Sequence, residues 1–168
     1  MELCNYMQKP NVRTYRIEAI EIPIVYNKYG DHDPDGLLYV LQKDADRIKR
    51  GALVNFNRPD PQPYEGVKPL VIRANLGEEI HIYFRHSLKR DLSIHVQGLR
   101  YDVQTSDGAS VGMNQDSTTR NEIVYTWYAE KEGVYLFSDM GDTRSSEEGT
   151  NIHGLFGPSS LKLLNLSG

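Results

Sequence analysis

Residues 69–85 read PLVIRANLGEEIHIYFR, and this stretch decides the fold class. A short apolar run at Leu70–Arg73 is followed by Gly77 and then by Glu79–Arg85, in which apolar and polar residues alternate. Alternation with a period of two is typical of a strand with one buried face. The stretch therefore predicts two short strands joined by a turn.

The same kind of pattern recurs on both sides of this stretch. Before it, Tyr15–Tyr26 alternates, and Pro23 indicates an edge position or a bulge near its far end. After it, we expect four more strands, at Leu92–Val96, Ile123–Tyr128, Val134–Phe137 and Leu161–Leu166. Many short strands separated by turn residues predict an all-β fold, a β-sandwich.

One amphipathic helix is expected within this pattern. Apolar residues recur at helical spacing between Leu41 and Phe56, with Gly51 interrupting the helix. Four prolines in residues 57–69 then exclude a helix interior or a central strand, so an extended connector follows. We expect a single domain over residues 1–168: an N-terminal extension (1–14), the first strand, acidic loop, helix and proline-rich connector (15–68), and the main sandwich (69–168).

Composition excludes several classes of function. The 168 residues suffice for one domain with a core, and a net charge of −4 gives no basic field for a nucleic acid. No apolar run approaches the roughly 20 residues of a membrane span, and the N-terminus lacks the pattern of a secretory signal. We therefore expect synthesis in the cytoplasm and neither a membrane nor a nucleic-acid partner.

Five segments of the chain resemble sequence motifs of a known protein family and occur in the same order as in that family. They are Pro69–Glu78, His95-Val96-Gln97-Gly98, Asp107-Gly108, Gly133–Phe137 and Gly154–Pro158. Together they resemble the first cupredoxin domain of the multicopper oxidases, whose motifs include H-x-H-G, D-G, Y-H-x-H and G-L-x-G-P. The helix and connector before residue 69 look most like the large bacterial members, including the manganese-oxidising kind. The resemblance implies a cupredoxin-like Greek-key β-sandwich and a copper-dependent oxidoreductase that reduces O₂ to water.

The blue-copper site of that family is not expected here. A blue site needs a Cys thiolate and two imidazoles, and the family carries the thiolate on a late strand. The single cysteine, Cys4, precedes the first predicted strand. One cysteine also excludes an internal disulfide or a Cys-x-x-Cys pair within the chain.

The three-copper cluster of the family takes two His pairs from the first domain. His95 matches the first of these ligands, but Gln97 stands at the second, and Ser138 and Met140 stand at the other pair. Amide and thioether groups are poor substitutes for imidazole on copper(II). We therefore take His95 as the first candidate metal ligand. The second candidate is His153, which precedes the Gly154 turn.

Two explanations of the missing ligands stay open at this point. In the first, the chain is a domain of a longer oxidase, unable to catalyse alone, whose copper ligands lie in other domains. In the second, the alignment of these loops is off by several residues. An alternative function is a non-catalytic cupredoxin-like module for assembly or partner binding. Expected partners are further cupredoxin domains or a homo-oligomer.

An acidic group of loop residues suggests a metal ion as a candidate substrate. Hard cations such as Mn(II) or Fe(II) prefer oxygen ligands, and a solvated acidic loop is the competing interpretation. The group consists of Asp107, Asp116, Asp139, Asp142, Glu147 and Glu148. No phosphate-binding loop, G-x-S-x-G or H-E-x-x-H motif is present.

Overall fold

The alternating segment at the centre of the sequence forms the central strand of a five-stranded sheet. In the computed structural model, which describes residues 11–109, 121–142 and 149–163, this strand is β6 (Glu79–His86). β1 (Val12–Glu21) runs parallel to it on one side and β9 (Ile123–Tyr128) antiparallel on the other. β4 (Leu37–Leu41) and β8 (Arg100–Tyr101) complete the order β4-β1-β6-β9-β8.

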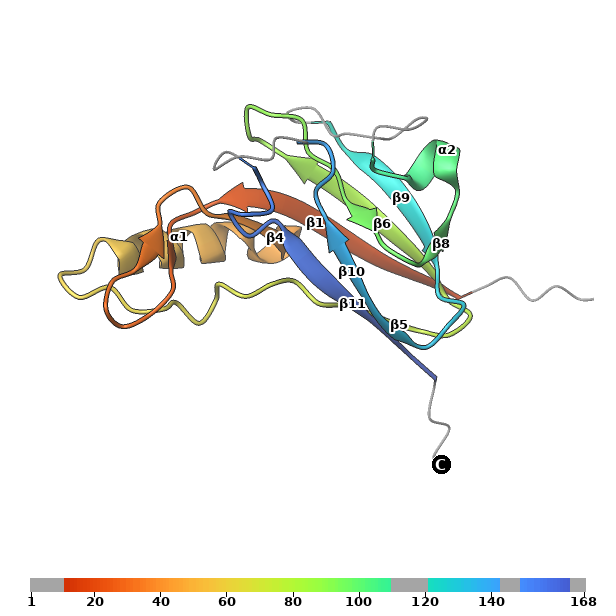
Figure 1. The fold of residues 1–168 in the computed structure, drawn as a ribbon, viewed down its shortest axis with the longest axis horizontal. Coiled ribbons are helices and arrows are strands. Elements are labelled where there is room, and N and C mark those ends of the chain that lie inside the picture. Colours follow the sequence, from red (N-terminus) through yellow and green to blue (C-terminus); the bar gives the residue numbers. More distant parts are fainter. Residues whose placement is uncertain (1–10, 110–120, 143–148, 164–168) are drawn as a thin grey trace, which may run out of the picture.

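A four-stranded sheet faces the first one (Figure 1). Its order is β5-β11-β10-β7, with β5 (Ile72–Asn75), β11 (Phe156–Lys162), β10 (Gly133–Ser138) and β7 (His95–Val96). A short pair, β2 (Ile24–Val25) and β3 (His32–Asp33), lies outside both sheets. The predicted all-β sandwich is therefore confirmed.

Aromatic side chains fill the space between the two sheets. Tyr39, Phe84 and Phe137 are fully buried, and the Tyr39 ring lies 5.8 Å from Phe84 and 5.7 Å from Phe137, centroid to centroid. The Tyr39 hydroxyl donates to the Ser93 carbonyl at 2.6 Å, and burial raises the pKa of Tyr39 well above 10. A buried hydroxyl with a partner avoids the cost of an unsatisfied polar group.

The predicted helix forms a third layer over β1 and β4. α1 (Ala45–Phe56), preceded by the 3₁₀ turn η1 (Gln42–Asp44), lies at the left of Figure 1. The helix buries Ile48 and Ala52 against Ile20 and Leu38, in a second apolar cluster. Ile17 and Tyr39, on the opposite side of the same strands, belong to the first cluster. β1 and β4 are thus buried on both faces where the helix covers them.

Two features of this region differ from the prediction. Leu41 ends β4 rather than beginning the helix, and the strand itself was not predicted. The run Leu37–Leu41 is apolar throughout because both of its faces are buried, so it shows no alternation. Gly51 does not interrupt α1: a β-carbon there would collide with the Tyr64 ring, so the glycine permits close packing.

Several strand boundaries were also wrong. β1 begins at Val12, so residues 12–14 belong to the sheet and not to an extension. The last strand is Phe156–Lys162 and not Leu161–Leu166, because Gly157 pairs with Phe137 and Leu161 with Gly133. Residues 164–166 lie outside the described part of the chain.

The remaining differences are small. The expected strands at Leu70–Arg73 and Leu92–Val96 are found at Ile72–Asn75 and His95–Val96. A short second helix, α2 (Val103–Ser106), was not expected; the Asp102 carboxylate caps it by accepting from the Gln104 and Thr105 amides. None of the helices in the described residues has the length and apolar character needed to cross a membrane.

Candidate metal-binding face

β7 and β10 bring the two expected ligand motifs together. In their antiparallel register, Val96 lies opposite Phe137 and His95 lies opposite Ser138. Val96 and Phe137 are buried in the core. Because successive side chains of a strand point to opposite faces, His95 and Ser138 both face outward. We call the outer surface around these two residues the β7–β10 face.

The His95 ring is held in one orientation. Its Nδ1 lies 2.7 Å from the Asp107 carbonyl oxygen, which can only accept, so Nδ1 donates this hydrogen bond and Nε2 is the ring nitrogen left for another partner. The Tyr101 ring packs edge-on at 5.9 Å between centroids. A histidine that donates one ring N–H to a carbonyl presents its other nitrogen in the manner of a metal ligand.

The Asp107-Gly108 turn supports this arrangement. The Asp107 carboxylate is almost fully buried and accepts from the Tyr101 hydroxyl at 2.8 Å and the Ala109 amide at 3.0 Å. Burial, and then this hydrogen bond, raises the pKa of Tyr101 to about 12, so the phenol stays protonated. Gly108 has φ +66° and a β-carbon there would lie 2.5 Å from the Ile94 carbonyl oxygen, which explains the glycine.

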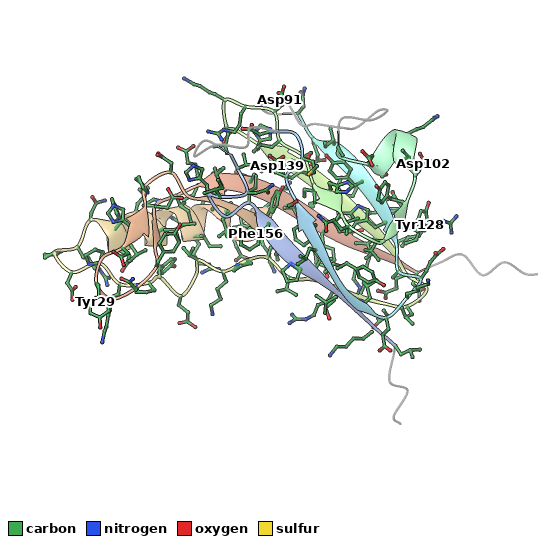
Figure 2. The ribbon with its side chains drawn as sticks, viewed as in Figure 1. Tyr29, Asp91, Asp102, Tyr128, Asp139 and Phe156 are labelled. Atoms are coloured by element: carbon green, nitrogen blue, oxygen red, sulfur yellow. The ribbon has the colours of Figure 1, made fainter. Side chains whose placement is uncertain are left out.

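Asp139 lies inside the molecule next to the β7–β10 face (Figure 2). Its Oδ1 accepts from the Ser93 amide at 2.8 Å and from the Gly141 amide at 3.0 Å. Its Oδ2 accepts from the Thr150 hydroxyl at 2.5 Å and from the Asp142 amide at 3.2 Å. A buried carboxylate with this many donors ties the end of β10 to two other segments.

The acidic group expected from the sequence is not an open rim where it is described. Asp107 and Asp139 are buried and hydrogen-bonded to protein donors, and the Asp142 side chain lies 3.6 Å from Arg90. Asp116, Glu147 and Glu148 lie outside the described residues. A metal-ion substrate at this group therefore stays a prediction.

His153 has a different set of neighbours from His95. Its Nδ1 lies 2.6 Å from the Asp33 carboxylate, and its carbonyl accepts from the Leu37 amide at 2.7 Å. These contacts join the turn before β11 to β3 and β4. The structure thus gives His153 a role in connecting segments, and no contact in the described residues joins it to His95.

The donors at the β7–β10 face do not fit a copper cluster built by this chain alone. Ser138 lies opposite His95 in the strand register, and Gln97 and Met140, two residues further along their segments, are exposed. Within residues 11–109, 121–142 and 149–163, no three His, Cys, Asp or Glu side chains are grouped to hold a metal ion. Cys4 lies outside these ranges.

The fold and the motif positions now permit comparison with known proteins. The family model described as multicopper oxidase matches residues 65–161, more than half of the chain. The chain belongs to the multicopper oxidase family. This membership implies copper as a cofactor of the family. The register places His95 opposite Ser138, and the assignment of His95 and His153 as metal ligands stays a prediction. No curated protein matches this chain.

Solved structures support the fold. A multicopper oxidase from Pseudomonas thermotolerans matches 92% of this chain with a TM-score of 0.64 and 16% identity, and the match covers 30% of that protein. A copper nitrite reductase from Nitrosomonas europaea matches 94% with a TM-score of 0.61 and 14% identity, over 44% of its length. A multicopper oxidase from Campylobacter jejuni, titled a metallo-oxidase, matches 95% with a TM-score of 0.58 and 20% identity, over 27% of its length. The chain thus spans less than half of each, as one cupredoxin-like domain.

Sequence reasoning missed the structural roles of two residues near the face. Asp139 was included in an acidic group of loop residues, for which a solvated loop was the competing interpretation, although it is a buried acceptor. Its position two residues after the end of the predicted strand Val134–Phe137 gave no signal of burial. The bond between His95 and the Asp107 carbonyl was also missed, because a main-chain contact across 12 residues leaves no pattern in the sequence.

Proposed function

We propose that this chain is a multicopper oxidase domain that supplies fold and contact surface to a copper-dependent oxidoreductase and does not catalyse oxygen reduction alone. One observation carries the proposal. Ser138 lies opposite His95 in the strand register, and by the resemblance Ser138 stands where the family has an imidazole of the second His pair, so this chain offers only one of the two donors there. The remaining copper ligands are then supplied by other domains.

The hypothesis is tested by loading the purified chain with copper and removing loosely bound metal with a weak chelator. We expect less than one retained copper per chain, no blue-copper absorption and no oxygen consumption with added reductant. Any retained copper should fall in His95→Ala and not in His81→Ala, a matched, partly buried histidine on the five-stranded sheet whose Nε2 contacts Glu79. Stoichiometric copper with oxygen consumption would refute the proposal.

The bacterial type of the parent oxidase, and a metal ion such as Mn(II) as its substrate, belong to the same proposal. Their support is the resemblance of the segment before residue 69, which contains α1 and the connector. Oxygen consumption by the assembled oxidase with Mn(II), compared with organic reductants, tests the choice of substrate. Activity with organic reductants alone would contradict it.

A second candidate, an assembly or partner-binding module, is favoured by the apolar character of the β10–β11 surface. Val134, Leu136 and Phe156 are 69%, 58% and 44% exposed, and register places them on the outward side of these strands with Pro158 and Ser160. Phe156 is labelled at the start of β11 in Figure 2. An exposed apolar patch on one sheet is typical of a contact surface, here for further cupredoxin domains or a second copy.

Light scattering during gel filtration tests the homo-oligomer. We expect association that weakens in Leu136→Lys and persists in Val103→Lys, a control at an exposed apolar residue of α2. A chain that stays monomeric at all concentrations would contradict self-association. Equal effects of the two variants would contradict the assignment of the surface.

A further inference from the structure

A basic pocket lies beside the paired strands β5 and β11, and Arg13 of β1 also lines it. Its volume is about 150 Å³, and it is lined by Arg13, Arg73, Ala74, Asn75, Ser160 and Lys162. β5 and β11 pair in parallel, with Arg73 opposite Ser160 and Asn75 opposite Lys162. Because Ala74 and Leu161 between them are buried, these four side chains share the outward face.

Within the part of the chain that the structure describes, the pocket holds two cations that no carboxylate neutralises. Arg73 and Lys162 are exposed, and neither side chain forms an ion pair or hydrogen bond with the described residues. Two uncompensated cations beside a hydroxyl and an amide form a donor set suited to an oxyanion.

The third cation is fixed in place by a carboxylate beneath the pocket. Arg13 donates from Nε and Nη2 to the two oxygens of Glu78, at 2.7 and 2.9 Å. Glu78 also accepts from the main-chain and side-chain nitrogens of Asn75, at 2.8 and 3.1 Å. Arg13 and Asn75 thus take up the hydrogen-bonding capacity of the Glu78 carboxylate. These hydrogen bonds, chiefly the one from Arg13, lower the pKa of Glu78 to about 2.

One other carboxylate stands beside the pocket. Glu132 accepts from the Leu163 amide at 3.2 Å and lines a neighbouring hollow with Ser160 and Lys162. It forms no ion pair with Lys162. When Glu78 is paired with Arg13, the remaining described charges at the pocket are the cations Arg73 and Lys162 and the anion Glu132, and their sum is positive.

Tyr15 gives the backbone at this place a fixed geometry. Its hydroxyl donates to the Arg73 carbonyl at 2.6 Å and accepts from the Arg73 amide at 3.0 Å. β5 is an edge strand, and the tyrosine thus satisfies the outward backbone groups of Arg73. The base of the Arg73 side chain is therefore held in position before any ligand arrives.

We propose that this pocket binds a small tetrahedral oxyanion of the phosphate class. The guanidinium of Arg73 and the ammonium of Lys162 supply the charge, and the Ser160 hydroxyl and the free donors of Arg13 complete the contacts. Arginine is suited to this task because its planar donors match two oxygens of one phosphate. The pocket size favours an ion or a terminal phosphate group over a folded partner.

The test is titration of the full chain with inorganic phosphate at constant ionic strength, followed by amide chemical shifts. We expect saturable shifts at Asn75, Ser160 and Lys162 with a single dissociation constant. That constant should rise at least tenfold in Arg73→Gln and in Lys162→Gln. Lys89→Gln, a charge-matched variant of an exposed lysine in the loop after β6, should leave it unchanged.

Each other result overturns the proposal. Chemical shifts that do not saturate would show only a response to net charge. The same conclusion would follow if Lys89→Gln weakened phosphate binding as much as Arg73→Gln and Lys162→Gln do. Equal affinity for acetate or chloride would contradict the phosphate class. Far-ultraviolet circular dichroism of each variant confirms that a loss of binding comes from a folded protein.

Discussion

At the residue scale, the β7–β10 face depends on one pair of neighbours. His95 presents Nε2 outward because Nδ1 is bound to the Asp107 carbonyl, and Ser138 lies opposite it in the register. Directly opposite side chains in an antiparallel pair have β-carbons about 4.5–5.5 Å apart. The face therefore has the spacing of a ligand pair with a hydroxyl in place of one ring.

Restoring the missing ring should create a metal site. We expect Ser138→His to bind Cu(II) at least tenfold more tightly than the natural chain, measured by competition with a chromophoric chelator. Ser160→His is the matched control, because its opposite neighbour on β10 is Val134. Equal gains in both variants would show that any added surface histidine suffices and would contradict the pairing.

Glu78 links a single residue to the pH dependence of folding. Its pKa is lowered to about 2 in the folded chain, from an ordinary value of 4.5, chiefly by Arg13. A lowered pKa stabilises the fold above the ordinary value, and this stability is lost as the pH falls from about 4.5 toward 2. Because the Arg13 side chain is 40% exposed, we expect a contribution of only about 1–2 kcal/mol.

Urea denaturation between pH 2 and 7 measures this contribution. Glu78→Gln should be less stable than the natural chain at pH 7 and should show a shallower loss of stability below pH 4.5. Glu65→Gln, which removes a highly exposed carboxylate near Lys68, should follow the natural curve. Parallel curves for Glu78→Gln and the natural chain would contradict the assigned pKa.

At the scale of elements, α1 is fixed by the connector that follows it. The Tyr64 ring lies over Gly51, in the space that a β-carbon would need, and it packs against the cluster beneath the helix. The Asn55 side-chain amide donates to the Gln62 carbonyl in the same connector. The proline-rich segment therefore covers the helix and is part of the third layer.

The role of Gly51 predicts that Gly51→Ala changes the free energy of unfolding in opposite directions in the natural chain and in the Tyr64→Ala variant. In the natural chain, Gly51→Ala should destabilise the fold by about 1 kcal/mol, because displacement of Tyr64 outweighs the better helix propensity of alanine. In Tyr64→Ala, the same change should stabilise by about 0.5–1 kcal/mol. Urea denaturation of the four variants measures the cycle. The same sign in both backgrounds would contradict the packing role.

At the scale of the whole molecule, two apolar clusters lie on either side of one sheet. The cluster between the sheets contains 19 buried residues of the described chain, and the one beneath α1 contains 7. Stability within a protein follows local packing, and smaller units open at lower free energy. The helical layer should therefore open before the sandwich.

Native-state hydrogen exchange tests this order. We expect amides of α1 to exchange at lower opening free energy than amides of β6 and β9. Ile48→Ala, in the smaller cluster, should lower protection mainly in α1 and cost about 2–3 kcal/mol there. Ile82→Ala, in the larger cluster, should lower protection in both layers. Equal opening free energies for α1 and β6 would contradict the two-layer order.

Many of the strands could be predicted from the local alternation of apolar and polar residues. β6 and β9 alternate because one face is buried and the other is not, so their positions were predicted closely. β4 was missed because the helix covers its second face, which removes the alternation. The last strand was placed too late, since its position depends on pairing with β10 and not on its own composition.

The sequence by itself determined the β-sandwich, the family motifs and the identity of the residues at the ligand positions, because these depend on residue type and short spacing. Only the tertiary structure decided that His95 faces Ser138, that Asp139 is a buried acceptor and that Arg73 meets Lys162 in one pocket. Such contacts join residues far apart in the chain. Sheet pairing and burial create them, and neither leaves a local pattern in the sequence.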